Sequence, residues 1–176
     1  MELFHSKDAV LSIDVDALQK MIECVLHHQT LEAGGILLGK KSSAGDTYSI
    51  VDVGLPSKFD KQGPVSFVRS KISAKRLVNK AWHQSCGVIN HIGEWHSHTF
   101  NSPWPSMQDQ CDMMRAYTDG EFVFNYFFTV IVSKDLQIFT GLVSHGNIID
   151  HNIVKIGGQV CTGTAQIRKA NGEEKL

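Results

Sequence analysis

The sequence lacks the features that mark several classes of protein. It has no C-x-x-C pair, and its four cysteines are scattered at positions 24, 86, 111 and 161. This pattern argues against a disulfide framework and a cysteine-based zinc site, and it predicts a reducing, cytoplasmic location. No apolar run approaches the roughly 18 residues that span a bilayer, and the N-terminus lacks a signal-peptide pattern. The formal net charge is -1, so the whole chain has no electrostatic reason to bind nucleic acid or an anionic membrane.

What is present predicts one globular domain with a mixed sheet. The chain has 176 residues, 42% of them hydrophobic, enough for a single buried core. We expect the domain over residues 1–162 and a polar tail over 163–176. Helical periodicity predicts helices over 14–28, capped by Asp14, over 71–85 and from about 106 to 117. The strands expected between them are GILLG, YSIVDV, VSFV, GVINHIGEW, FVFNYFFTVIVS and LQIFTGLVS, an α/β (α+β) pattern without strict alternation.

Two histidines lie at the end of one predicted strand. Side chains alternate along a strand, so His96 and His98 point to the same face with Cα atoms roughly 7 Å apart. Imidazoles at that spacing can converge on one metal ion. A catalytic zinc needs a third protein ligand and an open fourth position, so the pair alone is a weak signal.

Asp109 is the candidate third ligand. Pro103 and Pro105 force a turn after His98, and a helix that begins there can point its first turn back at the strand end. Ser106 and Asp109 would share one face of that helix. A structural alternative also fits, because Ser106-Met-Gln-Asp109 resembles a capping box. A serine that donates to a substrate does more than cap a helix, so the two interpretations predict different mutant phenotypes.

Hydrolysis at such a site also needs an acid/base, and two glutamates qualify. Glu94 precedes His96 by two residues on the same strand face. Glu32 is far away in sequence but begins the segment EAGGILLG. Its paired glycines allow the backbone to pass close to another segment or to a ligand. The residues alone do not decide between the two acids.

The full pattern resembles the JAMM motif of the MPN (JAB) metalloprotease family. That motif is a distant Glu, then H-x-H, seven residues and S-x-x-D, and the chain fills every position over roughly residues 3–145. The resemblance implies a curved mixed sheet flanked by helices, of the cytidine-deaminase-like kind. It implies one zinc ion held by His96, His98 and Asp109, with Glu32 as acid/base and Ser106 as oxyanion donor. In one departure from the family, Thr99 replaces the usual proline after the second histidine.

The same resemblance implies an isopeptidase. Family members remove or process ubiquitin-like modifiers, usually from lysine conjugates. An extended modifier tail can add to a sheet edge, and the loops 55–66 and 99–105 are candidate rims. The short chain is similar to stand-alone bacterial enzymes encoded beside E1-like and E2-like proteins, including those of CBASS-type antiphage operons.

Two alternatives remain open. One is a non-catalytic MPN scaffold that binds a ubiquitin-like partner without cutting it. The other is a small-molecule amidase or a sulfur-carrier-processing peptidase that uses the same site. Metal content and activity on a modifier fusion separate the scaffold from the enzymes.

Overall fold

The computed structural model describes residues 1–119, 124–145 and 147–156. Its helices are α1 (Val15–His27), α2 (Lys71–Gln84) and α3 (Met107–Asp119). Its strands are β1 (Glu2–His5), β2 (Val10–Ile13), β3 (Gly34–Lys41), β4 (Thr47–Val53), β5 (Lys61–Gly63), β6 (Ser66–Val68), β7 (Asn90–Ser97), β8 (Phe127–Val132), β9 (Gln137–Ser144) and β10 (Asn147–Lys155). The expected domain end at 162, the polar tail over 163–176 and Cys161 lie outside the described residues.

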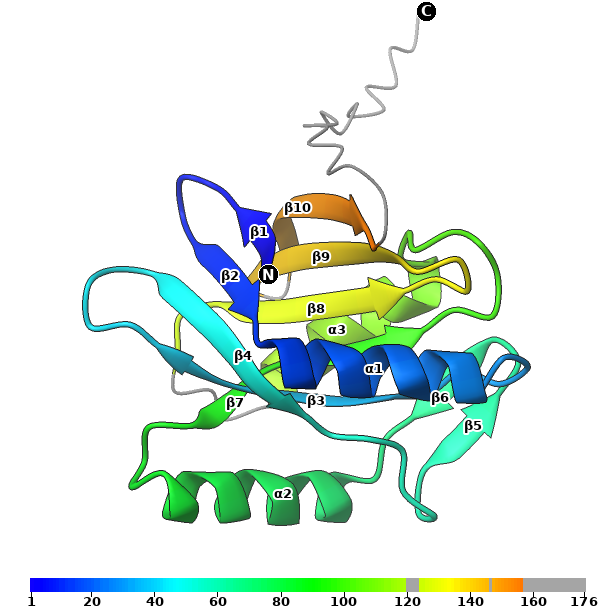
Figure 1. The fold of residues 1–176 in the computed structure, drawn as a ribbon, viewed down its shortest axis with the longest axis horizontal. Coiled ribbons are helices and arrows are strands. Elements are labelled where there is room, and N and C mark those ends of the chain that lie inside the picture. Colours follow the sequence, from blue (N-terminus) through cyan, green and yellow to red (C-terminus); the bar gives the residue numbers. More distant parts are fainter. Residues whose placement is uncertain (120–123, 146, 157–176) are drawn as a thin grey trace, which may run out of the picture.

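Eight strands form one curved sheet in the order β1-β2-β4-β3-β7-β8-β9-β10 (Figure 1). The pairs β2–β4 and β7–β8 are parallel, and the other neighbours are antiparallel. The two edge strands approach each other, since the Asn152 side chain of β10 donates to the Leu3 carbonyl of β1 at 3.4 Å. The sheet is therefore nearly closed, and the short β5–β6 hairpin forms a separate two-stranded sheet.

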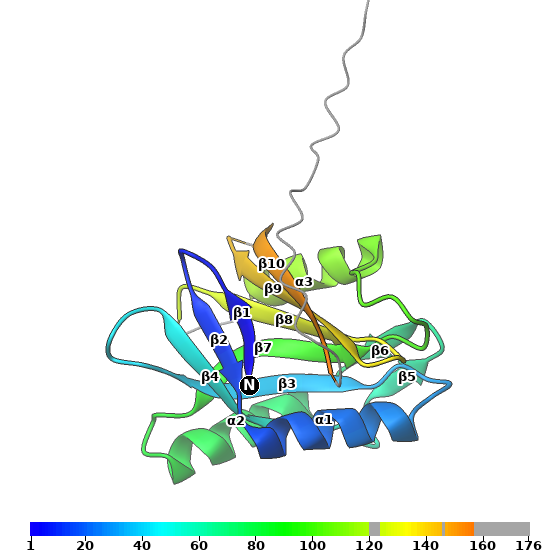
Figure 2. The same cartoon turned by 45° about the horizontal axis from the view of Figure 1, so that its top comes forward.

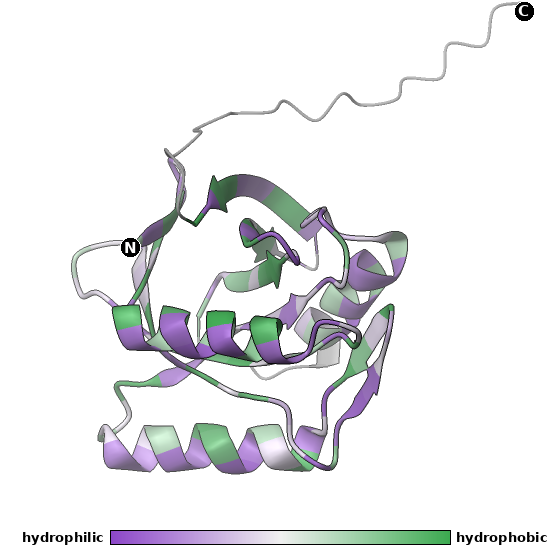
Figure 3. Cartoon of the chain, turned by 45° about the vertical axis from the view of Figure 1, so that its right-hand side comes forward, coloured by the Kyte–Doolittle hydropathy of each residue, from purple (hydrophilic) through white to green (hydrophobic). Residues whose placement is uncertain are grey.

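Helices cover both faces of this sheet (Figure 2). The main core joins α1 to one face and includes Leu37 and Phe128. Side chains one residue earlier point the other way: Ile36 packs beneath α2, and Phe127 packs beneath α3 with Met113. Apolar and polar bands alternate along α1 and α2 (Figure 3), as expected of helices with one buried side.

The predicted helices are confirmed within one or two residues. Asp14 occupies the N-cap position of α1, but its side chain makes no capping hydrogen bond, so that detail of the prediction is wrong. Four strands, β1, β2, β5 and β10, were not predicted from the sequence. The strand expected from residue 122 begins only at Phe127, and residues 122 and 123 lie outside the described part. No helix among the described residues is long and apolar enough to cross a membrane.

Two features of the topology position the site. The strand β7 pairs with β3 in a register that sets His96 opposite Gly34, so the turn before β3 lies beside the histidines. The connection from β7 to its parallel neighbour β8 runs through α3. The first turn of α3 therefore starts near the strand end that carries the histidines.

Candidate metal centre and its surroundings

The structure brings three predicted ligands together. The Nε2 atoms of His96 and His98 lie 3.3 Å apart. The Asp109 carboxylate places Oδ1 3.3 Å from His96 Nε2 and Oδ2 3.4 Å from His98 Nε2. These residues form the group among the described residues whose donor atoms are close enough to hold one metal ion.

The donor spacing fits a tetrahedral ion. Ligand atoms about 2.0–2.1 Å from a tetrahedral zinc lie about 3.3–3.4 Å from one another. The three separations, 3.3, 3.3 and 3.4 Å, match that value. Two imidazole nitrogens and one carboxylate oxygen are also a donor set that zinc accepts in catalytic sites, with a fourth position left open.

The ring of His98 is held in the orientation that a metal ligand needs. Its Nδ1 lies 2.9 Å from the Ser102 carbonyl oxygen, so Nδ1 carries the proton and donates. Nε2 then presents its lone pair to the cluster, as in many metal-binding histidines. The ring also stacks on Phe100 with centroids 4.6 Å apart.

Asp109 is oriented by a reciprocal helix cap. The Ser106 N–H donates to Asp109 Oδ2 at 2.7 Å, and the Asp109 N–H donates to Ser106 Oγ at 3.2 Å. The predicted capping box is therefore present. It uses a lone pair of the serine oxygen and leaves the hydroxyl proton able to donate elsewhere. Capping by Ser106 and donation to a substrate are thus compatible.

Burial is graded across the cluster. The His98 side chain is 2% exposed, whereas His96 and Asp109 are each 17% exposed. His98 forms the floor, and the other two ligands face the open side. Burial on its own would raise the pKa of Asp109, but hydrogen bonds and charge from the two histidines bring that pKa well below its usual range. Burial would lower the pKa of His98, and Asp109 and Ser102 more than offset this.

Glu32 lies beside the cluster although 64 positions separate it from His96. It is 4% exposed. Burial raises the pKa of its carboxyl, and the charges of His96 and His98 act in the opposite direction. Gly34, two residues further on, pairs with His96, which brings this part of the chain beside the cluster. The next residue is tied to β7: the Ala33 N–H donates to Ser97 Oγ at 2.9 Å, and the Ser97 N–H donates to the Ala33 carbonyl at 2.7 Å.

The glycines after Glu32 permit this close approach. A Cβ on Gly34 would lie 2.4 Å from the Trp95 carbonyl oxygen, and one on Gly35 would lie 2.1 Å from that of Gly54. Neither position tolerates a side chain without a backbone shift. The expectation that the paired glycines allow one segment to pass close to another is confirmed.

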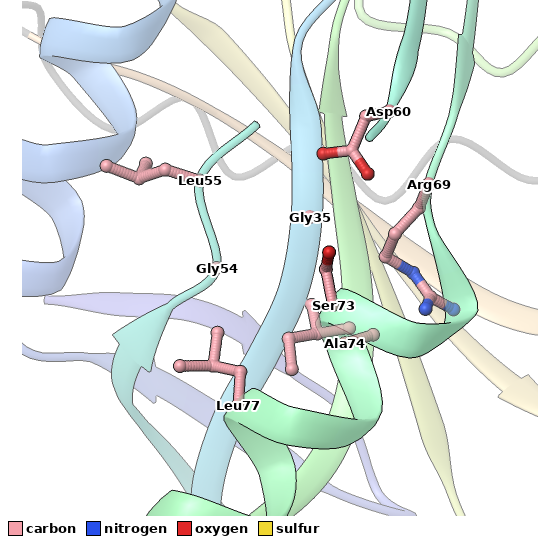
Figure 4. A pocket seen from close by; sticks show the side chains of 9 residues that line it. Gly35, Gly54, Leu55, Asp60, Arg69, Ser73, Ala74 and Leu77 are labelled. Atoms are coloured by element: carbon pink, nitrogen blue, oxygen red, sulfur yellow. The ribbon is translucent and has the colours of Figure 1, made fainter. Parts of the chain in front are cut away.

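The second candidate acid has a different environment. The Glu94 carboxylate forms an ion pair with Arg69, which lies between β6 and α2. A small cavity of about 40 Å³ borders Arg69, Asp60 and Ser73 (Figure 4). It lies beside α2, and its volume is far below the several hundred Å³ of ordinary ligand pockets. The Glu94 region is therefore a structural junction.

Several supporting residues had no distinct signal in the sequence. They are polar residues in strands or loops: Ser97, Ser102 and Gln62. Their partners lie far away in sequence or across an irregular loop, so only the folded chain reveals these contacts. The Gln62 side chain donates to the Glu32 carbonyl at 3.1 Å.

A wider groove of about 370 Å³ lies between α3 and the β9–β10 pair, lined by Trp104, Met113, Phe139 and His151 among others. It was not predicted.

Comparison with known proteins gives several curated relatives with one name, "CD-NTase/cGAS isopeptidase". A Vibrio cholerae serotype O1 protein is 30% identical over 96 residues, covering 54% of this chain and 60% of the relative. A Pseudomonas aeruginosa protein is 34% identical over 85 residues, covering 48% and 52%. An Enterobacter hormaechei protein is 29% identical over 121 residues, covering 68% and 66%. The matches to the Vibrio cholerae and Pseudomonas aeruginosa proteins thus span only 60% and 52% of those proteins' own length.

A solved structure and a family profile agree with the architecture. The solution structure of a Desulfitobacterium hafniense protein is similar with a TM-score of 0.57 and 16% identity, covering 82% of this chain and 90% of that protein. That likeness concerns the fold alone. Residues 14–141 match the family described as prokaryotic homologs of the JAB domain, and these residues include Glu32, both histidines, Ser106 and Asp109. The match covers well over half of the chain, which therefore belongs to the prokaryotic JAB-domain family.

Proposed function

We propose that the protein is a zinc-dependent isopeptidase. It cleaves the bond between the C-terminal carboxyl group of one protein, called the carrier protein below, and a lysine amine of a second protein. The observation that carries this proposal is the placement of a buried glutamate beside a His-His-Asp cluster with tetrahedral donor spacing. A scaffold protein needs neither the acid nor the spacing. Both are requirements of metal-assisted hydrolysis.

The ligands in this proposal are His96, His98 and Asp109. A zinc ion bound by them polarises a carbonyl group and lowers the pKa of water. His98 and Asp109 are held by the Ser102 carbonyl and the Ser106 amide, so the donor set is preorganised. Preorganised ligands bind a metal without the cost of ordering the loop.

Glu32 acts as the acid/base. Its buried carboxylate takes a proton from the attacking water and delivers it to the leaving lysine amine, which departs as a neutral group. Burial raises the pKa of this carboxyl, which makes it a better proton acceptor. The reciprocal bonds between Ala33 and Ser97 keep the next residue fixed on β7.

Ser106 donates its hydroxyl proton to the oxyanion that forms at the scissile carbonyl. The residue is exposed at the open side of the cluster, and its capping bond occupies only a lone pair. One such donor contributes about 10²–10³ in rate in other hydrolases. The same geometry therefore supports both a cap and a catalytic contact.

The names of the relatives narrow the substrate class. They describe isopeptidases of CD-NTase/cGAS proteins, so we infer that the carrier protein is a CD-NTase. Its C-terminus would be conjugated to lysine in the way that a ubiquitin-like modifier is. The setting is then a bacterial antiphage system, and E1-like and E2-like proteins would make the conjugate that this enzyme removes. The proposed location is the cytoplasm, in line with the scattered cysteines of the sequence.

The test is cleavage of a defined conjugate. A CD-NTase joined through its C-terminus to a lysine of a second protein should be cut to the two free proteins. Chelator should stop the reaction, and added zinc should restore it. A peptide that copies only the last residues of the carrier should be cut far more slowly, because contacts with the folded carrier position the scissile bond. A zinc-loaded protein that leaves the conjugate intact would favour the scaffold alternative.

A further inference from the structure

The β5–β6 hairpin is bonded to the peptide group of Glu32. The Glu32 N–H donates to the Gly63 carbonyl at 2.8 Å, and the Gln62 side chain donates to the Glu32 carbonyl at 3.1 Å. The ring of Phe67 lies close against Gly34, where an added Cβ would be 2.8 Å from it. The hairpin is therefore the wall of the site on the Glu32 side.

Thr99 bonds the tip of this hairpin to the opposite side of the site. Its hydroxyl donates to the Pro64 carbonyl at 2.8 Å, across 35 positions of sequence. Thr99 directly follows His98, and Pro64 lies in the turn between β5 and β6. A proline, which the JAMM pattern usually has at this position, carries no hydroxyl and cannot make this bond.

We propose that Thr99 is a positioning residue that latches the hairpin tip to the strand end carrying His98, so that the hairpin forms a fixed wall for the extended tail of the substrate. The functional part of this inference rests on the proposed isopeptidase activity. The latch itself does not depend on that activity, because it is a contact within the protein.

The hairpin needs such tethers because its own interactions are few. It pairs only three residues on each strand, and an isolated hairpin of that size is marginal in water. Several of its side chains gain little from burial, since Val65 is 76% exposed and Val68 is 58% exposed. Each hydrogen bond to the rest of the protein thus contributes a large share of what holds the hairpin in place.

Loss of the latch should affect substrate binding more than turnover. Glu32 keeps its separate connection to β7 through Ala33 and Ser97, so the acid stays near the cluster. The hairpin tip, by contrast, loses its contact with the loop after His98. The Thr99–Pro64 bond is exposed, and removal of one hydrogen bond corresponds to about a two- to tenfold change in an equilibrium.

Hydrogen exchange tests the latch without any substrate. The variants are Thr99→Val, which replaces the hydroxyl by a methyl group of similar size, Thr99→Pro, which installs the usual family residue, and Thr99→Ser, which restores the hydroxyl. Thr47→Val is the matched control, since Thr47 is an exposed threonine at the start of β4. We expect exchange over residues 61–68 to be about two- to tenfold faster in Thr99→Val and Thr99→Pro, and unchanged in Thr99→Ser and Thr47→Val. Equal exchange in Thr99→Val and the wild type would overturn the latch.

Kinetics test its consequence with one defined probe, a CD-NTase joined through its C-terminal residue to a lysine of a fluorescent protein. Thr99→Val should raise KM about two- to tenfold, change kcat less than KM and retain the wild-type zinc content, and Thr99→Ser should restore KM. An unchanged KM with faster hairpin exchange would overturn the role of the latch in substrate binding. If the wild type does not cut the conjugate, the proposed function fails, and the exchange experiment alone decides the latch.

Discussion

Glu32 and Glu94 are two acids near the same histidines, and their surroundings differ. Glu94 lies two residues before His96 on β7, and its carboxylate pairs with Arg69. Glu32 lies 64 residues before His96, is 4% exposed, and has a pKa that responds to the charges of both histidines. Nearness in sequence thus does not decide which of the two acids we propose as the acid/base. The Glu94 carboxylate is engaged by an arginine, whereas the Glu32 carboxylate is buried beside the candidate ligands, and burial raises its pKa, which favours it as the proposed proton acceptor.

The proposed acid/base can act only beside a bound metal, so loss of the metal is the largest expected effect. Asp109→Ala should weaken zinc binding more than about 100-fold, because loss of a supporting residue alone typically costs 10–100-fold. Elemental analysis of the purified variant measures this. Asp112→Ala is the control, since Asp112 lies on the same helix and its contacts with Arg115 and Gln108 are exposed. Full zinc retention in Asp109→Ala would mean that the ligand set is wrong.

Exchanging each acid for its amide tests the comparison directly. Glu32→Gln keeps size and removes the proton acceptor, so turnover of the conjugate should fall by about 10²–10⁴, with zinc content and melting temperature nearly unchanged. Glu94→Gln should keep most of the turnover. The reverse result, an inactive Glu94→Gln and an active Glu32→Gln, would transfer the role of acid/base to Glu94.

A substitution of Ser106 tests whether this residue only caps α3 or also takes part in the proposed reaction. Ser106→Ala should lower the rate by about 10²–10³ through loss of an oxyanion donor, and lower stability by about 1 kcal/mol through loss of the cap. Ser70→Ala is the matched control, because Ser70 caps α2 by accepting from the Ser73 N–H and lies away from the cluster. Ser70→Ala should cost stability and leave turnover intact. If Ser106→Ala behaves in the same way, Ser106 is only a cap.

The smallest expected effect concerns stability at the Arg69–Glu94 junction. Glu94→Gln leaves the guanidinium of Arg69 without its charged partner, and Arg69 Nε is already buried without a hydrogen-bond partner. The side chains are 23% and 30% exposed, so the loss should lie between that of exposed and buried ion pairs, about 1–2 kcal/mol. Urea unfolding measures it. Asp112→Asn, in a much more exposed pair, should show no measurable change.

The sequence predicts the elements that carry a strong local pattern. The helices α1 and α2 have an apolar stripe of helical period, and β8 and β9 are almost continuously apolar because both faces are covered. The strands β1 and β2 have only four residues each. The strand β10 mixes polar and apolar residues without alternation, and its pairing with β9 supplies the order that its sequence does not show.

The candidate site likewise has a part that local sequence patterns predict and a part that they do not. His96, His98, Ser106 and Asp109 lie within 14 positions of one another, so strand alternation and a forced turn predict their convergence. The position of Glu32 depends on the register of β3 against β7, which sets Gly34 opposite His96. No local pattern encodes that register, and only the resemblance to the JAMM motif indicated Glu32. The contacts of Ser97 and Thr99 depend on the same long-range pairing.

The bonds between Ala33 and Ser97 have a consequence for how the active site comes into being during folding. They join segments 64 residues apart, and contacts of that separation form only after the intervening chain has paid the entropy of loop closure. The His-His-Asp trio is local by comparison, with 12 residues between His96 and Asp109. Under the proposed function, the candidate ligands can therefore come together before the proposed acid/base is in place. The proposed activity would need the central β3–β7 pair, so a partly folded chain with a metal ion at the cluster would not yet hydrolyse the proteins around it.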